Sequence, residues 1–308
     1  MESAPGCRYG QQVIHSAELN EETTLPRIVY LNGEWLAEAD AKVSIFDRGF
    51  LFADAIYEVT GVIGGKLLEY SGHTTRLKRS LTELGIECPL TDEELLAVHR
   101  EIVRRNDLNE GLIYLQISRG AADRDFAFPV DAKPTLVLFT QAKAVLDNPK
   151  VKTGISVALV PDERWGRRDI KTVQLLYPSM AKMKASEVGA DDAWLVEDGF
   201  VTEASSATSH IITTDGKLVT RGLSNAILHG ITRLSVLDIA RQAGIEVEER
   251  AFTPEEAKNA AEAFVTSATS FVLPVTRING EPVGTGVPGP LTAKLRQLYI
   301  EAKLATAI

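Results

Sequence analysis

The sequence predicts an α+β protein with a smaller N-terminal domain and a larger, strand-rich C-terminal domain. Its 308 residues are too many for one small core and too few for three domains. The segment VLDNPKVKTG contains Asn148-Pro149 and Gly154, which interrupt helices and strands alike. Strands alternate with helices before this break, and strands dominate after it. The expected boundaries are an extension at 1–27, a small domain at 28–144, a linker at 145–154 and a large domain at 155–308.

The small domain should open with a hairpin. Residues 1–27 mix polar and small side chains without a period, so we expect an N-terminal extension there. From Ile28, the run IVYLNGEWL places two short apolar stretches on either side of Asn32-Gly33, the dipeptide most typical of a tight hairpin turn. A third strand, AIYEVTGVI, ends before a second turn at Gly64-Gly65.

Two helices and two further strands complete the small domain. Leu77, Leu81 and Leu84 repeat at helical spacing between His73 and Leu84, and Gly85 predicts the end of that helix. Thr91, followed by three acidic residues, supplies an N-cap for a second helix. The runs LIYLQISRG and PTLVLFTQA are the expected strands after it.

The large domain should consist mainly of strands and two helices. The strands are expected in ISVALV, DAWLVEDGFV, SHIITTDGKLV and AEAFVTSA, with tight turns at Asp198-Gly199 and Asp215-Gly216. One helix is expected from about Ser179 to Val188 and another from Gly230 to Gly244. In the second helix, Leu234, Leu237 and Ile239 suggest the buried stripe.

Composition and charge exclude several classes of protein. The formal net charge is -9, so no basic stripe is available to contact a nucleic-acid backbone. No run of 18 apolar residues and no signal-peptide pattern occur, and we expect a soluble, unexported, cytoplasmic protein without a membrane partner. Cys7 and Cys88 lie in no metal-binding or redox motif, so we expect no metal site and a reducing compartment, although the two could pair.

Lys171 and Glu203 are the first candidates for chemistry. Any one lysine is usually a solvated surface charge. In DIKTVQLL, however, Lys171 precedes Val173, Leu175 and Leu176, an apolar wall of the kind that makes an amine nucleophilic. A lysine that forms a Schiff base with a pyridine cofactor also requires a carboxylate that keeps the ring nitrogen protonated. Glu203, in DGFVTEASSATS, is the candidate for that carboxylate.

Several motifs, in the same order and with similar spacing, resemble one known family. They are VSIFDRGFLFADAIYEV, RDIKTVQLLYPSMAKMKASEVGADDAWLVEDGFVTEASSATS, LSNAILHGITR and TSATSFVLPVTRING. From about Ile28 to about Leu304, the sequence is similar to the class-IV aminotransferases, the fold-type-IV pyridoxal-phosphate enzymes, and most similar to the D-amino-acid transaminases. The resemblance implies the two-domain fold of that family, pyridoxal 5'-phosphate as cofactor, and a homodimer with active sites at the subunit boundary.

The resemblance also implies a role for each cofactor-binding residue. Lys171 would carry the cofactor as a Schiff base, and Glu203 would pair with the pyridine nitrogen. Arg76, in GHTTRLKR, would grip the phosphate. Ile231 and Thr232 begin the helix GITRLSVLDIA, where free backbone N–H groups favour a phosphate. Leu228 would pack on the cofactor ring.

The sequence departs from the family pattern around the cofactor. Ala204, Ala207 and Thr208 stand where the family commonly has a glycine, a serine and an asparagine. In the TSATS turn, the position of the expected phosphate-binding hydroxyl is Ala268. Its neighbours Ser267 and Thr269 are the candidates to replace that hydroxyl.

The loop SRGAADRDFAFP is the expected substrate-recognition segment. In D-amino-acid transaminases, the corresponding loop presents an arginine and a histidine which, with a strand tyrosine, hold the substrate carboxylate in the neighbouring subunit's site. Here Arg124 matches the arginine and Tyr57 matches the tyrosine, whereas Phe126 occupies the histidine position. An arginine fork still binds a carboxylate, but an aromatic ring favours an apolar group.

The function expected from these residues is ping-pong transamination between D-amino acids and 2-oxo acids. Because of Phe126, we also expect turnover of (R)-primary amines. Two alternatives within the family are a branched-chain-type L-amino-acid aminotransferase and an aminodeoxychorismate lyase. A non-catalytic binding protein of the same fold is the alternative from another class, and the presence of both Lys171 and Glu203 argues against it.

Overall fold

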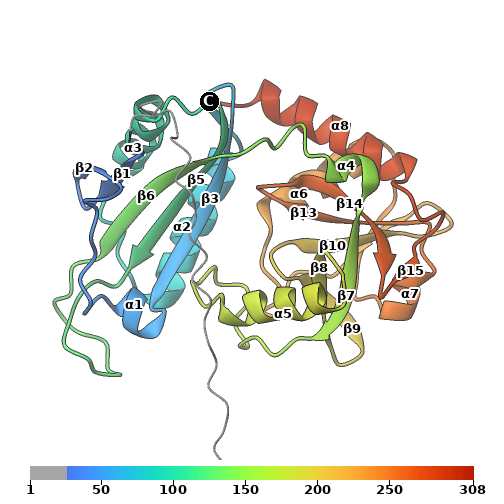
Figure 1. Ribbon diagram of the computed structural model, residues 1–308, viewed down its shortest axis with the longest axis horizontal. Helices are drawn as coiled ribbons and strands as arrows, with labels where there is room; N and C mark the ends of the chain where they lie inside the picture. The colour runs from blue at the N-terminus through green and yellow to red at the C-terminus, as the bar shows by residue number, and fades with distance from the viewer. Residues whose placement is uncertain (1–25) are drawn as a thin grey trace, which may run out of the picture.

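Two β-sheets organise the computed structural model, which describes residues 26–308 (Figure 1). Almost all of the expected N-terminal extension lies outside the described residues, as does Cys7. The fold is α+β, as the sequence predicts. None of the helices between residues 26 and 308 is long and apolar enough to cross a lipid bilayer.

The first sheet has six strands in the order β2-β1-β6-β5-β3-β4. Its strands are β1 (Ile28–Leu31), β2 (Glu34–Ala37), β3 (Ala55–Ile63), β4 (Lys66–Leu67), β5 (Glu110–Ser118) and β6 (Thr135–Ala142). Asn32 and Gly33 both have positive φ angles, 49° and 98°, as a tight hairpin turn requires. Leu31 pairs with Glu34 across that turn, so the predicted hairpin is confirmed.

Three helices accompany this sheet: α1 (Arg48–Phe52), α2 (Tyr70–Leu84) and α3 (Asp92–Arg105). Gly85 ends α2 in the left-handed conformation, as predicted. At the start of α3, the Thr91 side chain accepts from the Glu94 N–H and the Glu94 side chain accepts from the Thr91 N–H, which is a capping box. Leu77 and Leu81 are buried in the core between these helices and the sheet.

The second sheet has nine strands, in the order β12-β11-β10-β13-β14-β7-β8-β9 with β15 paired to β14. The strands are β7 (Ile155–Pro161), β8 (Asp192–Glu197), β9 (Phe200–Ala204), β10 (Thr208–Ile212), β11 (Leu218–Thr220), β12 (Val247–Glu249), β13 (Glu262–Ser267), β14 (Phe271–Ile278) and β15 (Glu281–Pro282). Its helices are α4 (Lys150–Thr153), α5 (Leu176–Glu187), α6 (Ile231–Gln242), α7 (Pro254–Lys258) and α8 (Pro290–Ala305).

This half of the chain contains more helix than the sequence analysis expected. Besides the two expected helices, α5 and α6, the structure has α4 inside the expected linker, α7 and the long α8. The buried stripe of α6 is also different, because Leu234 is exposed whereas Val236, Leu237 and Ala240 are buried. Spacing along the sequence fits either stripe, and packing against the second sheet and α8 selects the observed one.

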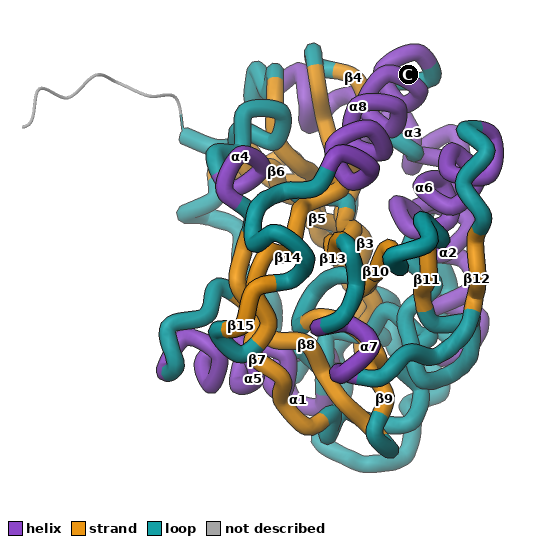
Figure 2. The backbone as a smooth tube through the Cα atoms, turned by 90° about the vertical axis from the view of Figure 1, so that its right-hand side faces the viewer, coloured by secondary structure: helices purple, strands orange, loops and turns teal. Residues whose placement is uncertain are grey.

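One place where the two halves of the chain meet is at the starts of α2 and α6. A Cβ atom on Gly72 of α2 would come within 2.9 Å of Ile231 Cγ2, so the two helix starts approach as closely as a glycine allows. Beside this contact, the buried carboxylate of Glu69 accepts hydrogen bonds from Ser235 of α6 and Tyr299 of α8. The chain's last residue, Ile308, pairs with Leu67 of β4, so the C-terminus returns to the first sheet (Figure 2).

Candidate active site

A cavity of about 700 Å³ opens between β3 and α2 of the first half and the loops and strands of the second. Nine of the eleven expected site residues line it, namely Tyr57, Arg76, Lys171, Glu203, Leu228, Ile231, Thr232, Ser267 and Thr269. These residues come from both halves of the chain, so the cavity exists only where the two halves meet.

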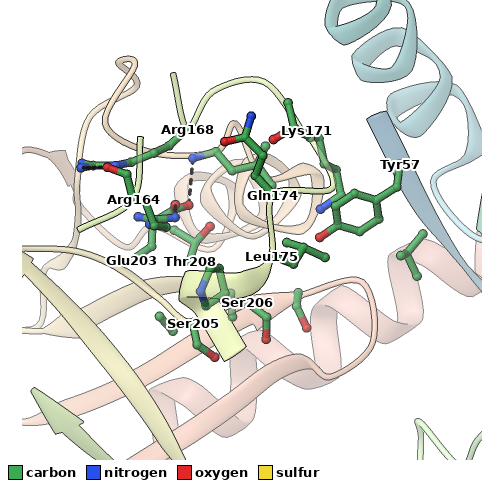
Figure 3. Close-up of a pocket in the computed structure, with 18 of the residues that line it drawn as sticks. Tyr57, Arg164, Arg168, Lys171, Gln174, Leu175, Glu203, Ser205, Ser206 and Thr208 are labelled. Carbon is green, nitrogen blue, oxygen red and sulfur yellow. Dashed lines mark hydrogen bonds and ion pairs between the residues drawn. The ribbon is translucent and has the colours of Figure 1, made fainter. Parts of the chain in front are cut away.

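Lys171 is held beside β3 by backbone pairing. The Tyr57 N–H donates to the Lys171 carbonyl at 3.0 Å, and Thr172 forms a bridge with Ile56. This pairing places the Lys171 Nζ 4.1 Å from the centre of the Tyr57 ring (Figure 3). Lys171 is therefore fixed at the cavity edge with its amine over an aromatic face.

The apolar wall expected after Lys171 is not buried. Leu175 is 38% exposed and Leu176 is 76% exposed in the single chain, although both line the cavity. Both side chains lie at the start of α5, outside the buried core. The prediction of a buried apolar wall is thus wrong for these two positions.

Glu203 lies buried on β9, across the cavity from Tyr57 (Figure 3). Its Oε1 accepts the Leu228 N–H at 2.9 Å, and its Oε2 accepts from Arg164 Nη1 at 2.7 Å. Burial raises the pKa of Glu203, while the charge and hydrogen bond of Arg164 oppose that rise. A carboxylate has about four acceptor positions, so Glu203 retains capacity for one more donor from the cavity.

Arg164 is a site residue that the sequence analysis missed. It lines the cavity and makes two hydrogen bonds to Asp162, from Nε at 2.9 Å and from Nη2 at 2.7 Å. Asp162 also accepts from the Thr202 hydroxyl, one residue before Glu203. The available sequence signal was the charge-dense run PDERWGRRD between β7 and Lys171.

Arg76 lines the cavity from α2, and its contacts place it at the end of the cavity beside the start of α6. Its Nε and Nη2 donate to the two oxygens of Glu58 at 2.7 and 2.8 Å, and its Nη1 donates to the His229 carbonyl at 3.0 Å. A guanidinium has five N–H groups. Two of them therefore remain for an anion in the cavity.

The start of α6 faces the same end. Gly230 is the N-cap of α6 and provides no side-chain cap. The backbone N–H groups of Ile231 and Thr232 therefore donate to no capping side chain. The buried Thr232 hydroxyl lines the cavity and has no hydrogen-bond partner among the described residues. Together with Arg76, these groups form an anion-binding end that fits a phosphate.

Ser267 and Thr269 occupy the turn between β13 and β14. The Ser267 hydroxyl lies 2.7 Å from the Ser270 hydroxyl and 3.3 Å from the Thr269 hydroxyl. Ala268 lies between them and also lines the cavity. The turn therefore brings two hydroxyl groups to the cavity on either side of the alanine.

The three other departures from the family pattern, Ala204, Ala207 and Thr208, also line the cavity. Ala204 and Thr208 are buried, while Ser205 between them donates to Asp192. The replacements therefore change the cavity surface next to Glu203 without removing its hydrogen bonds to Arg164 and Leu228.

Glu58 is a second missed residue, and it supports Arg76. It is buried on β3 and also bonds the Nδ1 of His73 at 2.8 Å. Burial alone would raise its pKa, but the charge and hydrogen bonds of Arg76, together with His73, outweigh burial and hold the pKa well below the usual range. A carboxylate in the middle of the strand AIYEVTGVI was the available signal, because a charged residue is rarely buried without a partner.

Arg124 and Phe126 do not line the cavity of their own chain. They lie on the loop between β5 and β6, beside α1 at the far end of the first sheet (Figure 1). Phe126 is 78% exposed and packs edge-on against Phe52, and the Arg124 guanidinium lies 5.3 Å from the Phe52 ring centre. The single chain thus assembles the cofactor side of the site and leaves the loop outside it.

The cavity holds the groups that the expected chemistry needs. Within residues 26–308, no group of three or more His, Cys, Asp or Glu side chains is arranged to hold a metal ion. A lysine over an aromatic ring, a buried carboxylate and an anion-binding end instead surround one space. This set matches what a phosphorylated pyridine cofactor requires.

Comparison with known proteins gives consistent matches. Residues 55–278 match the family model described as Amino-transferase class IV. The D-alanine aminotransferase of Bacillus licheniformis is 37% identical over 270 residues, which cover 87% of this chain and 94% of that protein. The D-alanine aminotransferase of Staphylococcus aureus (strain COL) is 38% identical over 280 residues, covering 89% and 98%.

Solved structures show the same fold. The branched-chain aminotransferase of Thermoproteus uzoniensis, solved with norvaline, superposes with a TM-score of 0.78 at 26% identity, covering 90% of this chain and 95% of that one. The branched-chain amino acid aminotransferase of Escherichia coli superposes with a TM-score of 0.84 at 20% identity, covering 90% and 95%. At 20% identity, the similarity to the Escherichia coli enzyme shows the fold alone.

The substitution Glu58→Gln should lower the free energy of unfolding by about 3 to 5 kcal/mol at pH 7, because Arg76 would keep a buried charge without its partner. The folded-state pKa of Glu58 lies below its ordinary value of 4.5. Its contribution is therefore fully present above that pH and is lost as the pH falls through the folded-state value. Urea unfolding at several pH values should show the gap between wild type and variant narrowing towards acid.

The matched control is Glu101→Gln, which removes an exposed carboxylate paired with Arg104 and Arg105. Unfolding of that variant should be close to wild type, since exposed pairs contribute little. A gap for Glu58→Gln that stays constant from pH 7 to the acid range would contradict the charged pair.

Proposed function

This chain belongs to the class IV aminotransferases, and on that premise we propose that it transfers amino groups from D-amino acids to 2-oxo acids. The family model covers residues 55–278, and the D-alanine aminotransferases are 37–38% identical over nearly nine tenths of the chain. The protein is accordingly a pyridoxal-phosphate-dependent aminotransferase. The observation that carries the proposed site is the convergence of Lys171, Glu203 and Arg76 on one cavity.

Each cofactor-side residue has a distinct task in this proposal. Lys171 would hold the cofactor covalently through Nζ, and its amine would move the proton at the substrate Cα. Glu203 holds the ring nitrogen protonated, and Arg164 keeps that carboxylate in place. Pyridoxal phosphate supplies a conjugated ring that accepts the electrons released at Cα.

The anion-binding end fixes the cofactor's phosphate. Arg76 offers its two unused N–H groups, and the start of α6 offers backbone N–H groups and the Thr232 hydroxyl. Ser267 and Thr269 supply further hydroxyls beside Ala268. Leu228, whose N–H donates to Glu203, would pack against the cofactor ring. Holding both ends prevents rotation of the ring while the proton moves.

The substrate side requires a second copy of the chain. Tyr57 lines the cavity, whereas Arg124 and Phe126 are exposed and outside it. Large exposed apolar side chains surround that loop, namely Ile45, Phe46, Phe50, Phe128 and Val130. An apolar patch of this kind favours burial in an interface. We therefore propose a homodimer in which the loop of one subunit closes the cavity of the other.

In that arrangement Arg124 and Tyr57 hold the carboxylate of a D-amino acid. Phe126 changes the pocket, because an aromatic ring provides no hydrogen bond to a carboxylate and favours an apolar group. Recognition of D-amino acids should then be less strict than with a histidine at this position. The proposed substrates therefore include (R)-primary amines that carry no carboxylate.

The second candidate function is that of a branched-chain-type L-amino-acid aminotransferase. The observation in its favour is the superposition on the Thermoproteus uzoniensis enzyme with a TM-score of 0.78. Turnover of L-leucine that exceeds turnover of every D-amino acid would select this function. Release of pyruvate without a 2-oxo acid acceptor would instead indicate a lyase of the aminodeoxychorismate type.

Lys171 should be the residue that carries the cofactor. Borohydride reduction of the purified holoenzyme should fix the cofactor covalently, because it reduces the carbon–nitrogen double bond of a Schiff base. Peptide mapping by mass spectrometry should place the adduct on Lys171. An adduct on Lys182 or Lys184, both in α5, would show that the wrong lysine was assigned.

Arg124→Ala should raise the KM for D-alanine about tenfold or more, because a charge-assisted hydrogen bond to the carboxylate is lost. The KM for an (R)-arylalkylamine should change much less, since that substrate has no carboxylate. Phe126→His should shift preference towards the amino acid. Steady-state kinetics with D-alanine, L-alanine and the amine measure all three effects.

Asp123→Ala is the control in the same loop, because the exposed Asp123 neighbours Arg124. It should leave both KM values near wild type. Unchanged D-alanine kinetics in Arg124→Ala, or a preference for L-amino acids in the wild type, would reject the carboxylate clamp and the D-amino-acid assignment.

A further inference from the structure

A buried cluster of charged side chains lies at the base of the loop between β5 and β6. It comprises Arg48, Asp54 and Arg119, whose side chains are 3%, 9% and 9% exposed. Arg48 Nε donates to Asp54 Oδ2 at 2.8 Å, and Arg119 Nε donates to the same oxygen at 2.7 Å. None of the three lines the cofactor cavity, so the proposed chemistry does not explain the cluster.

Arg48 uses the rest of its guanidinium to bind loop backbone. Its Nη1 donates to the Asp125 carbonyl at 2.6 Å and to the Ala127 carbonyl at 3.3 Å. These two carbonyls flank Phe126, and the first belongs to the residue directly after Arg124. One side chain therefore holds the backbone on both sides of the proposed specificity position.

Arg119 connects the same cluster to two other places. Its guanidinium lies 3.7 Å from the ring centre of Phe128, within the range of a cation–π contact. It also donates to the carbonyls of Leu84 and Gly85, at the end of α2. Since α2 carries Arg76, the cluster ties the loop to the helix that holds the proposed phosphate site.

The base of the loop is packed too tightly to move alone. A Cβ atom on Gly120 would lie 1.9 Å from the Lys133 carbonyl oxygen, and Gly120 has a positive φ of 101°. The Arg48 N–H also donates to the Gly120 carbonyl at 2.9 Å. The ends of the loop are thereby fixed. Beyond them, Arg48 holds the part of the loop that bears Arg124 and Phe126.

We infer that Arg48 is a positioning residue for substrate recognition. By binding the carbonyls of Asp125 and Ala127, it sets where Arg124 and Phe126 are presented, although Arg48 itself touches no substrate. The inference rests on the proposed function, in which Arg124 binds the substrate carboxylate. In the motif FDRGFLFADA, Arg48 and Asp54 thus serve the loop, whereas Ala53 lines the cofactor cavity.

A lysine cannot replace Arg48 in this task. An ammonium carries all of its donors on one nitrogen, whereas the guanidinium spreads its donors over a rigid plane. Arg48→Lys would retain the charge beside Asp54 and lose the simultaneous grip on the two carbonyls. The substitution therefore separates a role in loop position from a role in charge balance.

The test is a double-mutant cycle of Arg48→Lys and Arg124→Ala, measured with D-alanine on the holoenzyme. Arg48→Lys alone should raise the KM for D-alanine about five- to tenfold and leave kcat within about twofold, since only a positioned interaction is weakened. In the Arg124→Ala background, Arg48→Lys should cause almost no further loss. The two effects are then non-additive because both act through Arg124.

Hydrogen exchange of the loop amides gives a readout that is independent of activity. Peptides covering residues 122–128 should exchange faster in Arg48→Lys than in wild type. The matched control is Arg105→Lys, because Arg105 also pairs with a glutamate and lies over an aromatic ring, Trp35, away from this loop. That variant should show wild-type loop exchange and wild-type KM.

Two results would overturn the inference. Additive losses in the cycle would mean that Arg48 does not act through Arg124, and unchanged loop exchange in Arg48→Lys would mean that it does not position the loop. Failure of the proposed function is a separate result, since Arg124→Ala alone would then leave the KM for D-alanine unchanged.

Discussion

The close approach of the starts of α2 and α6 is the constraint on which the anion-binding end of the site depends. One helix carries Arg76 and the other begins with Ile231 and Thr232, so the anion-binding end exists only where the two meet. The absence of a side chain at Gly72 permits the approach, and the buried Glu69 carboxylate stabilises it by accepting from Ser235 and Tyr299. A second contact between the halves is the backbone pairing of the Lys171 segment with β3.

The site divides into a part built within one chain and a part that the single chain leaves open. Buried ion pairs support the cofactor residues internally, with Glu58 beneath Arg76 and Arg164 beside Glu203. The loop with Arg124 has its own buried support, yet it lies outside the cavity of its chain. In our proposal, this division makes cofactor binding a property of the subunit and substrate choice a property of the dimer.

Local sequence signals predicted local structure well. Asn32-Gly33, Gly85 and the Thr91 cap each depend on neighbours within a few residues, and each is where the sequence placed it. The eight residues that the family resemblance assigns to the cofactor all line one cavity. Contacts between residues far apart in the chain could not be predicted from the sequence. Arg164 bonds to Glu203, 39 positions away, and Arg48 bonds to Ala127, 79 positions away. Leu234 was predicted to be buried but is exposed. The buried face of α6 is likewise selected by packing against distant parts of the chain.

Mixed dimers of Lys171→Ala and Arg124→Ala chains test the division between subunits most directly. If the loop serves the neighbouring cavity, such a dimer contains one site with an intact Lys171 and an intact Arg124. Co-expression with two affinity tags and tandem purification should yield a mixed dimer with wild-type KM for D-alanine and about half the wild-type kcat per dimer, one site in two. Activity no greater than that of the two parent variants would contradict the account.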